Sequence, residues 1–217
     1  MSTANLTQSN SPSFSEVIQT RRAIRHYDPS VHISHDEIKQ LLEEANLAPS
    51  STNLQPWRFF IIDTEELRTK LLPVTFHQKQ VMEASAVIVV LGDTEGYKRA
   101  GEIYGEATKQ GLMPEEVSKA FIEKTLNRYN ALTKEDISRI ILVDGGLVSQ
   151  QFMLAARAHN YDTGPLGYDP VGLIQAFDIS DRYIPIMVIT LGKAEQPGHP
   201  SIRLPIDDIT FFNTKPE

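Results

Sequence analysis

Residues 48–62 of this 217-residue chain read Ala-Pro-Ser-Ser-Thr-Asn-Leu-Gln-Pro-Trp-Arg-Phe-Phe-Ile-Ile, and this stretch decides the kind of fold that we expect. Pro49 ends the preceding helix, because proline disfavours helical geometry in the residue before it. Hydroxyl and amide side chains fill the space between Pro49 and Pro56, as is typical of a loop. Trp57–Ile62 is apolar and aromatic, which predicts a strand.

Two capping boxes predict helices before this loop. The sequence Ser-x-x-Glu occurs at Ser13–Glu16 and again at Ser34–Glu37, and in each case the two side chains can satisfy backbone amides of a first helical turn. The second helix carries its apolar residues at helical spacing: Ile38, Leu41, Leu42, Ala45 and Ala48. Residues 1–13 are polar, and we expect a flexible lead-in there.

Two more apolar runs follow the loop, at Ala86–Leu91 and Ile184–Leu191, and both predict strands. Helices separate the strands, and the longest covers residues 137–158. Gly145 and Gly146 lie inside that helix, where each costs roughly 1 kcal/mol relative to alanine. We therefore expect close helix packing at this point.

This order of elements predicts one α+β domain over residues 14–217, with helices packed against a single sheet; an α/β arrangement stays open. Residues 96–136 are charged and helical in composition, and we expect them to form a helical lid or excursion. Residues 204–217 form a C-terminal arm that ends near Phe211 and Phe212. The apolar face of the helix at 137–158 and this arm suit either a partner subunit or an internal core.

The composition excludes several classes of function. The chain has no cysteine, so it forms no disulfide, no Cys-ligated zinc site, no iron–sulfur cluster and no thiol nucleophile. Its net charge of −7 argues against nucleic-acid and anionic-membrane partners, because domains that bind them are usually basic. No apolar run approaches the ~20 residues that span a bilayer. We expect a cytoplasmic protein.

Three arginines within five residues, Arg21, Arg22 and Arg25, form the strongest local cluster. Guanidinium groups bind phosphate or carboxylate through paired hydrogen bonds, which favours an anion site. The same cluster also suits a solvated helix end, where cations complement the helix dipole.

Three other stretches offer ligand-binding groups, and each has a plainer alternative. The amides in the loop at 50–55 provide both donors and acceptors, as the edge of an isoalloxazine or purine requires, or they form an ordinary polar loop. Glycines in Gly164–Asp169 let the backbone approach a flat ligand closely, or simply make a turn. Lys193 and Arg203 form a second clamp on an anion, or they are surface charges.

Other patterns in the sequence give weaker evidence for a functional site. His32 and His35 stand beside Asp36, but they flank a helix start, so we expect no metal there. Asp207 and Asp208 are typical of a solvated tail. The chain has no G-x-G-x-x-G, P-loop or G-x-S-x-G motif, so a Rossmann dehydrogenase, a nucleoside triphosphatase and a serine hydrolase lack their fingerprints.

Taken in this order, the clusters resemble the nitroreductase family of FMN-dependent NAD(P)H oxidoreductases. Arg21–Tyr27 matches the pattern RR-x-x-R-x-[FY], and Ala48–Trp57 matches APSSxNxQPW. The match spans about residues 14–206 and continues through three further segments: Gln78–Ala86, Gly164–Asp169 and Arg203–Pro205.

The resemblance implies a mostly antiparallel sheet flanked by helices in an intertwined homodimer, with FMN at the subunit interface. It also implies hydride transfer from NADH or NADPH through FMN to nitroaromatics, quinones or similar small-molecule acceptors in a ping-pong cycle. No catalytic side chain and no metal are then required, because the cofactor carries the chemistry.

By the same resemblance, arginines hold the ribityl phosphate and the pyrimidine edge of the flavin, residues 50–55 approach from the partner subunit, and residues 165–167 lie over the ring. The implied FMN-binding residues are Arg21, Arg22, Ala23, Arg25, Ser50, Ser51, Asn53, Gln55, His77, Gln80, Pro165, Leu166, Gly167, Lys193 and Arg203.

The sequence departs from the family pattern at two of these positions. Ala23 stands where many members have serine, and Gln80 stands where some have lysine, so a hydroxyl and a positive charge near the cofactor are absent. Two alternatives stay open: a flavin-fragmenting or dehalogenating branch of the same fold, and a non-catalytic flavin-binding redox sensor. A nucleic-acid-binding role for the arginine triplet is a more distant one.

Overall fold

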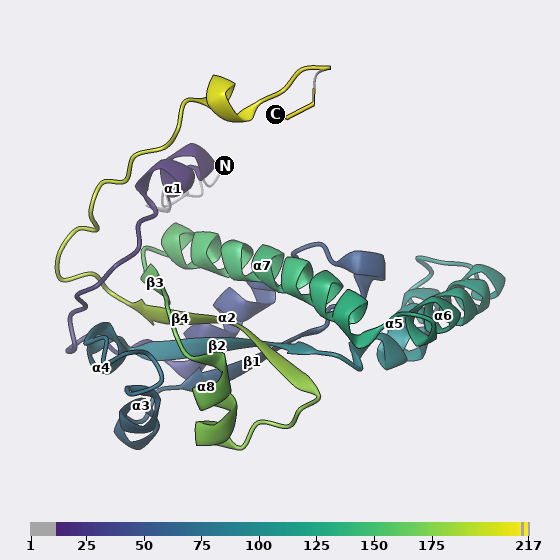
Figure 1. The fold of residues 1–217 in the computed structure, drawn as a ribbon, viewed down its shortest axis with the longest axis horizontal. Helices are drawn as coiled ribbons and strands as arrows, with labels where there is room; N and C mark the ends of the chain where they lie inside the picture. The colour runs from purple at the N-terminus through teal and green to yellow at the C-terminus, as the bar shows by residue number, and fades with distance from the viewer. Residues whose placement is uncertain (1–11, 214, 217) are drawn as a thin grey trace, which may run out of the picture.

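Four antiparallel strands form one sheet in the order β1-β2-β4-β3 (Figure 1). The structure is a computed structural model that describes residues 12–213, 215 and 216, so most of the expected lead-in at 1–13 lies outside the described residues. The strands are β1 (Trp57–Ile62), β2 (Ala86–Asp93), β3 (Asp162–Leu166) and β4 (Tyr183–Gly192). β1 and β3 are the two edges of the sheet, and the three predicted strands are confirmed as β1, β2 and β4.

Helices connect the strands. They are α1 (Phe14–Thr20), α2 (His35–Ala45), α3 (Glu65–Leu71), α4 (Gln80–Glu83), α5 (Ala100–Lys109), α6 (Glu115–Asn130), α7 (Lys134–Ala158) and α8 (Pro170–Phe177), with short 3-10 turns η1 (Ser51–Asn53), η2 (Gly96–Arg99) and η3 (Ile206–Ile209). The capping boxes predicted at Ser13 and Ser34 are confirmed. α7 begins three residues earlier than predicted, because Thr133 and Asp136 form a third capping box.

Helices cover both faces of the sheet (Figure 1). α2 and α7 pack on one face, and α3, α4 and α8 pack on the other. Alternate residues of β2 enter the two cores: Ile88 and Val90 belong to the first, and Val87 and Val89 to the second. Both faces of β2 are therefore buried, which explains why its sequence is apolar rather than alternating.

Two expectations were wrong in detail. The stretch from Gly164 to Leu166, which has the composition of a turn, belongs to strand β3. It pairs with β4 in spite of Pro165, because β3 is an edge strand and its outer side needs few ladder hydrogen bonds. Gly145 packs against a strand and not a helix, since a Cβ there would lie 2.2 Å from a side-chain carbon of Ile186 in β4, whereas Gly146 meets nothing within 4 Å.

Two segments extend from this body (Figure 1). Residues 96–130 form η2, α5 and α6, which pack on the start of α7 around Tyr104, Tyr129 and Ile141. After β4, residues 197–213 form a C-terminal arm, which includes the described part of the predicted arm at 204–217 and runs past α1. Within the described ranges, no helix combines the length and the apolar character that crossing a membrane would require.

Candidate functional site

The segment after α1 lies along strand β3. The Ile24 amide donates a hydrogen bond to the Thr163 carbonyl at 3.0 Å, and Ala23 forms a parallel bridge with Thr163. A Cβ on Gly164 would lie 2.4 Å from the Ile24 carbonyl oxygen, so glycine is needed for this close approach. The segment thereby brings the arginine cluster to the edge of the sheet.

Three arginines gather beside this edge from distant parts of the sequence. A Cβ on Gly198 would lie 2.4 Å from Cβ of Arg22, so the C-terminal arm passes directly against the segment after α1. Burial lowers the pKa of Arg21, and the nearby charges of Arg22 and Arg203 lower this pKa further. Like charges held together without a counter-charge create a strong preference for an anion.

The other cations of the cluster are arranged differently. Arg22 donates from Nη1 to the carbonyls of Gln19, at 2.7 Å, and Arg21, at 2.8 Å, so it also caps the end of α1. Lys193 donates from Nζ to the Asn160 carbonyl at 2.7 Å. Arg25 is exposed. Arg22 thus caps a helix end, as the plainer alternative expects, and Arg21 lies among positive charges. The anion site stays a prediction.

A tight loop lies at the far end of β3. Gln78 donates from Nε2 to the Gly167 carbonyl at 2.8 Å, which joins the loop to the residues after the strand. Phe76 and His77 adopt left-handed backbone conformations, with φ of 54° and 56°, and both side chains are exposed. Gln80 is buried, and its Nε2 donates to Oε1 of Gln78 at 3.4 Å. The structure thus presents Phe76, His77 and Gln78 at this end of β3 rather than Gln80.

The polar loop at 50–55 is strained and firmly held. Thr52, Asn53 and Gln55 have φ of 55°, 50° and 45°, a region that residues other than glycine seldom occupy. Its hydrogen bonds come from inside and outside the loop: the Gln55 amide donates to Oγ of Ser50 at 3.0 Å, and the Tyr104 hydroxyl donates to the Thr52 carbonyl at 2.7 Å. Such strain persists only where surrounding contacts impose it, which is common at ligand-binding sites.

The loop at 50–55 lies at the middle of α7, whereas the arginine cluster lies near its C-terminal end. The Ser51 amide donates to Oδ1 of Asp144 at 3.0 Å, whereas Thr20, next to Arg21, accepts from Nε of Arg157 at 3.0 Å. Asp144 and Arg157 are thirteen residues apart on one helix, which corresponds to about 20 Å along its axis. Within one chain, the predicted site residues therefore form two separate groups.

Three cavities follow the outer side of edge strand β1. Their volumes are about 900, 310 and 550 Å³. Trp57, Arg58 and Phe59 line the first cavity, and Ile61 and the following Asp63 line the second. Asp63 also lines the third, so the row follows the whole length of β1. The row of cavities forms a groove beside the edge of the sheet.

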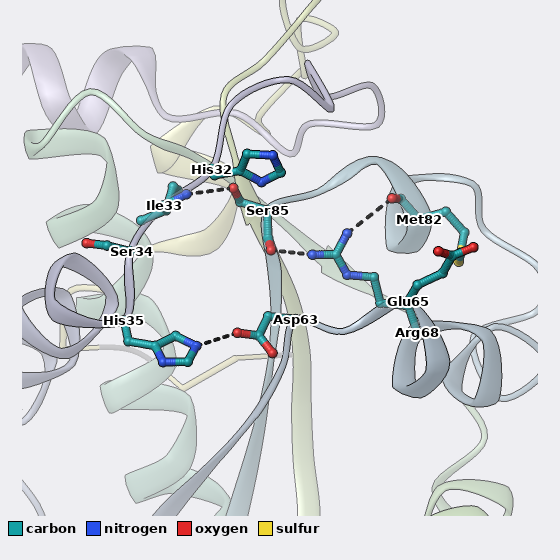
Figure 2. Close-up of a pocket in the computed structure, with 9 residues that line it drawn as sticks. All are labelled: His32, Ile33, Ser34, His35, Asp63, Glu65, Arg68, Met82 and Ser85. Atoms are coloured by element: carbon teal, nitrogen blue, oxygen red, sulfur yellow. Dashed lines mark hydrogen bonds and ion pairs between the residues drawn. The ribbon is translucent and has the colours of Figure 1, made fainter.

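The third cavity contains the two histidines that we singled out from the sequence (Figure 2). His35 lies with Nε2 at 2.5 Å from Oδ2 of Asp63, and the guanidinium of Arg68 donates to the carbonyls of Ser85 and Met82. Among the described residues, no three His, Cys, Asp or Glu side chains are placed to hold a metal ion.

Comparison with known proteins agrees with this geometry. The sequence profile of the nitroreductase family matches residues 18–193, which include Arg21, Arg22 and Arg25, the loop at 50–55 and all four strands, but not Arg203. The chain belongs to the nitroreductase family.

Individual relatives cover nearly the whole chain. YdgI of Bacillus subtilis (strain 168), which carries the name of a candidate NAD(P)H nitroreductase, is 46% identical over 199 residues, which are 90% of this chain and 95% of YdgI. An enone reductase of CLA biosynthesis from Lactiplantibacillus plantarum is 32% identical over 185 residues, which are 83% of this chain and 85% of that protein. The crystal structure of a candidate nitroreductase from Exiguobacterium sibiricum in complex with FMN has a TM-score of 0.90 and 45% identity, and covers 95% of this chain and 100% of that one.

The structure divides the residues predicted for this family into two groups. Along β3 and beside it lie Arg21, Arg22, Ala23, Arg25, His77, Pro165, Leu166, Gly167, Lys193 and Arg203, and over the middle of α7 lie Ser50, Ser51, Asn53 and Gln55. Gln80 is buried behind Gln78 and belongs to neither surface. The side chain of Leu166 points into the core, so only its backbone can face a ligand.

Sequence reasoning missed three residues beside these groups. Phe76 and Gln78 lie in an unremarkable polar stretch, and only the folded loop brings them to Gly167. Asp144 had a visible signal, since it is the single carboxylate in an otherwise apolar and small-residue stretch, Ile140–Val148. A carboxylate on an apolar helix face is buried only where another polar group pairs with it or where it serves a function.

Proposed function

We propose that this member of the nitroreductase family is an FMN-dependent oxidoreductase that passes reducing equivalents from NADH or NADPH to a small electron-poor acceptor. The proposal includes a ping-pong cycle, with nitroaromatics or quinones as acceptors. It also includes a cytoplasmic location, where both nicotinamide donors are available. The FMN complex of the Exiguobacterium relative supports the choice of cofactor.

The observation that carries the proposal is the uncompensated positive cluster beside β3. No ion pair of the described residues includes Arg21, Arg22, Arg25 or Arg203. A phosphate monoester carries nearly two negative charges and accepts bidentate hydrogen bonds, so it fits these guanidinium groups. The donor set of the chain thus suits the phosphate of FMN.

The rest of the edge suits a flat ring. Gly164 lets the strand pack closely on Ile24, and the backbone of Pro165–Gly167 continues the same edge with only Pro165 and Gly167 exposed. The exposed ring of Phe76 lies beside Gly167. When bound, FMN supplies the hydride and electron transfer chemistry, and the residues of β3 and the loop at 76–80 orient it and limit access of water.

A homodimer completes this proposal. A ligand seated at the arginine cluster cannot be reached by the loop of the same chain about 20 Å away along α7, so we assign Ser50, Ser51, Asn53 and Gln55 to the cofactor of a second copy. On α7, Leu142, Val143 and Leu147 expose apolar side chains around the open Gly146, as a partner-facing surface would.

The C-terminal arm supports an intertwined dimer. Ile202 and Leu204 lie two residues apart in the part of the arm before η3 and are 95% and 68% exposed. Period-two apolar residues are typical of a strand that buries one face. The groove beside β1 offers a free strand edge with an apolar wall, so we assign this groove to the arm of the second copy. Figure 2 shows the end of the groove at Asp63 and Arg68.

The helices between β2 and α7 supply a lid in this proposal. Residues 96–136 project from one end of the sheet, and Phe121 of α6 exposes 44% of its surface next to Tyr104, with ring centroids 5.7 Å apart. We assign this aromatic surface to the acceptor. The enone reductase relative adds electron-poor carbon–carbon double bonds to the acceptors worth testing.

The test is reconstitution followed by an acceptor panel. Purified protein should be yellow and should hold about one FMN per chain as a dimer. Without oxygen, it should oxidise more than one equivalent of NADH or NADPH per FMN only when a nitroaromatic, quinone or enone is present. Protein that takes up no FMN would refute the proposal. Protein that binds FMN and reduces no acceptor would instead support the redox-sensor alternative.

A further inference from the structure

The side chain of Asp144 is buried in the middle of α7, beneath the loop at 50–55. Only 4% of the residue is exposed, and Oδ1 accepts the hydrogen bond from the Ser51 amide at 3.0 Å. Oδ2 is also buried, and within the part of the chain that the structure describes it has no hydrogen-bond partner. The carboxylate therefore leaves water for a single hydrogen bond.

Stability does not explain such a group. A buried carboxylate with one unsatisfied oxygen is unfavourable relative to an apolar side chain of similar size. Its neighbours on the inner face of α7 are Ile141 and Val148, both in the core, and a leucine would continue that surface. Burial also raises the pKa of Asp144, which expresses the same cost.

The carboxylate of Asp144 holds the backbone of the loop above it. Thr52 and Asn53 follow Ser51 directly and hold left-handed backbone angles, so the orientation of the Ser51 peptide determines where the next residues point. Oδ1 of Asp144 is the acceptor that fixes this peptide. Removing it leaves the strained turn held mainly through Ser50 and Tyr104.

We propose that Asp144 is a positioning residue, whose buried carboxylate fixes the Ser51 peptide and thereby aims the hydroxyls and amides of residues 50–55 at the cofactor of the second copy. This inference rests on the proposed function for its ligand. The role of Asp144 can be tested separately from the proposed function, because its effect on the loop exists before any ligand binds. Asp144 touches neither cofactor nor substrate and acts through Ser51.

The experiment compares Asp144→Asn, Asp144→Ala and Ser149→Ala in the full-length protein. Asp144→Asn keeps an acceptor at Oδ1, whereas Asp144→Ala removes it. Ser149 is a matched control, because it is also buried in α7 but donates only to the Gly145 carbonyl, at 2.6 Å, within the same helix. Each variant is measured for amide hydrogen exchange at 50–55 without FMN, for FMN affinity, for the reduction potential of bound FMN and for melting temperature.

We expect Asp144→Ala to speed exchange at 50–55 and to shift the potential of bound FMN. FMN binding should weaken about tenfold, because the loop that Asp144 no longer holds must then be ordered when FMN binds. The melting temperature should be unchanged or higher, because a buried carboxylate is removed. Asp144→Asn should restore exchange and FMN affinity to within about threefold of the parent. Ser149→Ala should leave all three cofactor and loop properties unchanged.

Three results would overturn the inference. One is parental exchange at 50–55 in Asp144→Ala, and another is parental FMN affinity and potential in that variant. The third applies if Asp144→Ala does not fold. Asp144→Asn keeps the acceptor, so fast exchange at 50–55 and weak FMN binding in this variant would then contradict the role of the acceptor. Failure of the parent protein itself to bind FMN would refute the proposed function, while the exchange data would still test the role of Asp144 in the loop.

Discussion

Arg203 lies on the C-terminal arm, yet its charge acts on Arg21 at the end of α1. The contact of Gly198 with Arg22 explains how the arm reaches this place. A binding site built from both ends of the sequence requires each end to be held, and an anion between the guanidinium groups would remove their mutual repulsion. Charge at these residues should therefore act on the phosphate of the cofactor and not on its ring.

This leads to a prediction for Arg203→Ala. The variant should bind FMN about tenfold to hundredfold more weakly, since it loses a charge-assisted contact to the phosphate, but should bind riboflavin as the parent does. Flavin fluorescence titration measures both. Arg139→Ala is the control, because Arg139 is an exposed α7 arginine paired only with Glu135, and its FMN affinity should be parental. Equal losses for FMN and riboflavin would contradict a phosphate contact.

Asp93 is a buried carboxylate that two arginines contact. Its carboxylate is fully buried and binds Arg182 through two hydrogen bonds, at 2.6 and 2.7 Å, and Arg58 through one at 2.7 Å. Burial alone would raise the pKa of Asp93, but the hydrogen bonds from Arg182 and the Glu95 amide and the two positive charges outweigh it and lower the pKa below 3.8. The network joins the ends of β1, β2 and β4.

Asp93→Asn should lower the free energy of unfolding by about 2 kcal/mol at pH 7, less than a fully buried pair because both arginines are partly exposed. A folded-state pKa below the unfolded value means that this contribution is complete above about pH 4 and is lost as the pH falls through the folded-state pKa. Urea unfolding of both proteins from pH 7 to 3 measures it. A gap that stays constant or widens in acid would contradict the assignment.

At the scale of elements, the contact between α7 and β4 depends on Gly145. A methyl group there would lie 2.2 Å from Cδ1 and 2.8 Å from Cγ2 of Ile186. Gly145→Ala should therefore destabilise the protein by about 1–2 kcal/mol, because overpacking exceeds the gain in helix propensity. Ile186→Val should relieve part of this loss in the double variant.

The control is Gly101→Ala on α5, where an added Cβ meets nothing within 4 Å. This variant should gain about 0.5–1 kcal/mol from helix propensity alone. Thermal unfolding of the two glycine variants compares them directly. Equal effects at Gly101 and Gly145 would show that α7 does not require this close approach to β4.

Most elements could be predicted from the sequence, because their signals are local. Capping boxes at Ser13 and Ser34 and the apolar run of β2 depend only on neighbouring residues. Strand β3 could not be predicted in this way, since its glycine and proline are tolerated only at an edge that the rest of the sheet creates. Close packing at Gly145 could be predicted, but not its partner, because the glycines in the sequence indicate a close contact without showing that β4 supplies it.

The candidate site also has features that the sequence predicts and features that only the fold shows. The arginines and the loop at 50–55 are recognisable as motifs, but their separation along α7 appears only in the fold. Phe76 and Gln78 belong to a loop that contacts Gly167, which is about ninety residues further along the sequence. Local patterns thus name the ligand-binding groups, whereas folding decides which of them one chain can bring together.

At the scale of the whole molecule, the arm and the groove beside β1 predict how two copies associate. Ile202→Asp together with Leu204→Asp should shift the protein from dimer to monomer and reduce bound FMN, since both side chains are exposed in one chain and would be buried in the dimer. Sedimentation velocity measures the shift. Ser201→Asp is the control on the same arm, and a dimer that survives the double substitution would contradict arm exchange.

The proposed function requires that this fold holds FMN as an electron carrier between a nicotinamide and an acceptor. The most direct test is an anaerobic stopped-flow experiment on the purified dimer, with each half of the cycle followed separately. We predict that NADH or NADPH bleaches the visible flavin absorption in the absence of acceptor, and that a nitroaromatic or quinone added afterwards restores it. Bound flavin that neither nicotinamide reduces, or a reduced form that no acceptor reoxidises, would contradict the account.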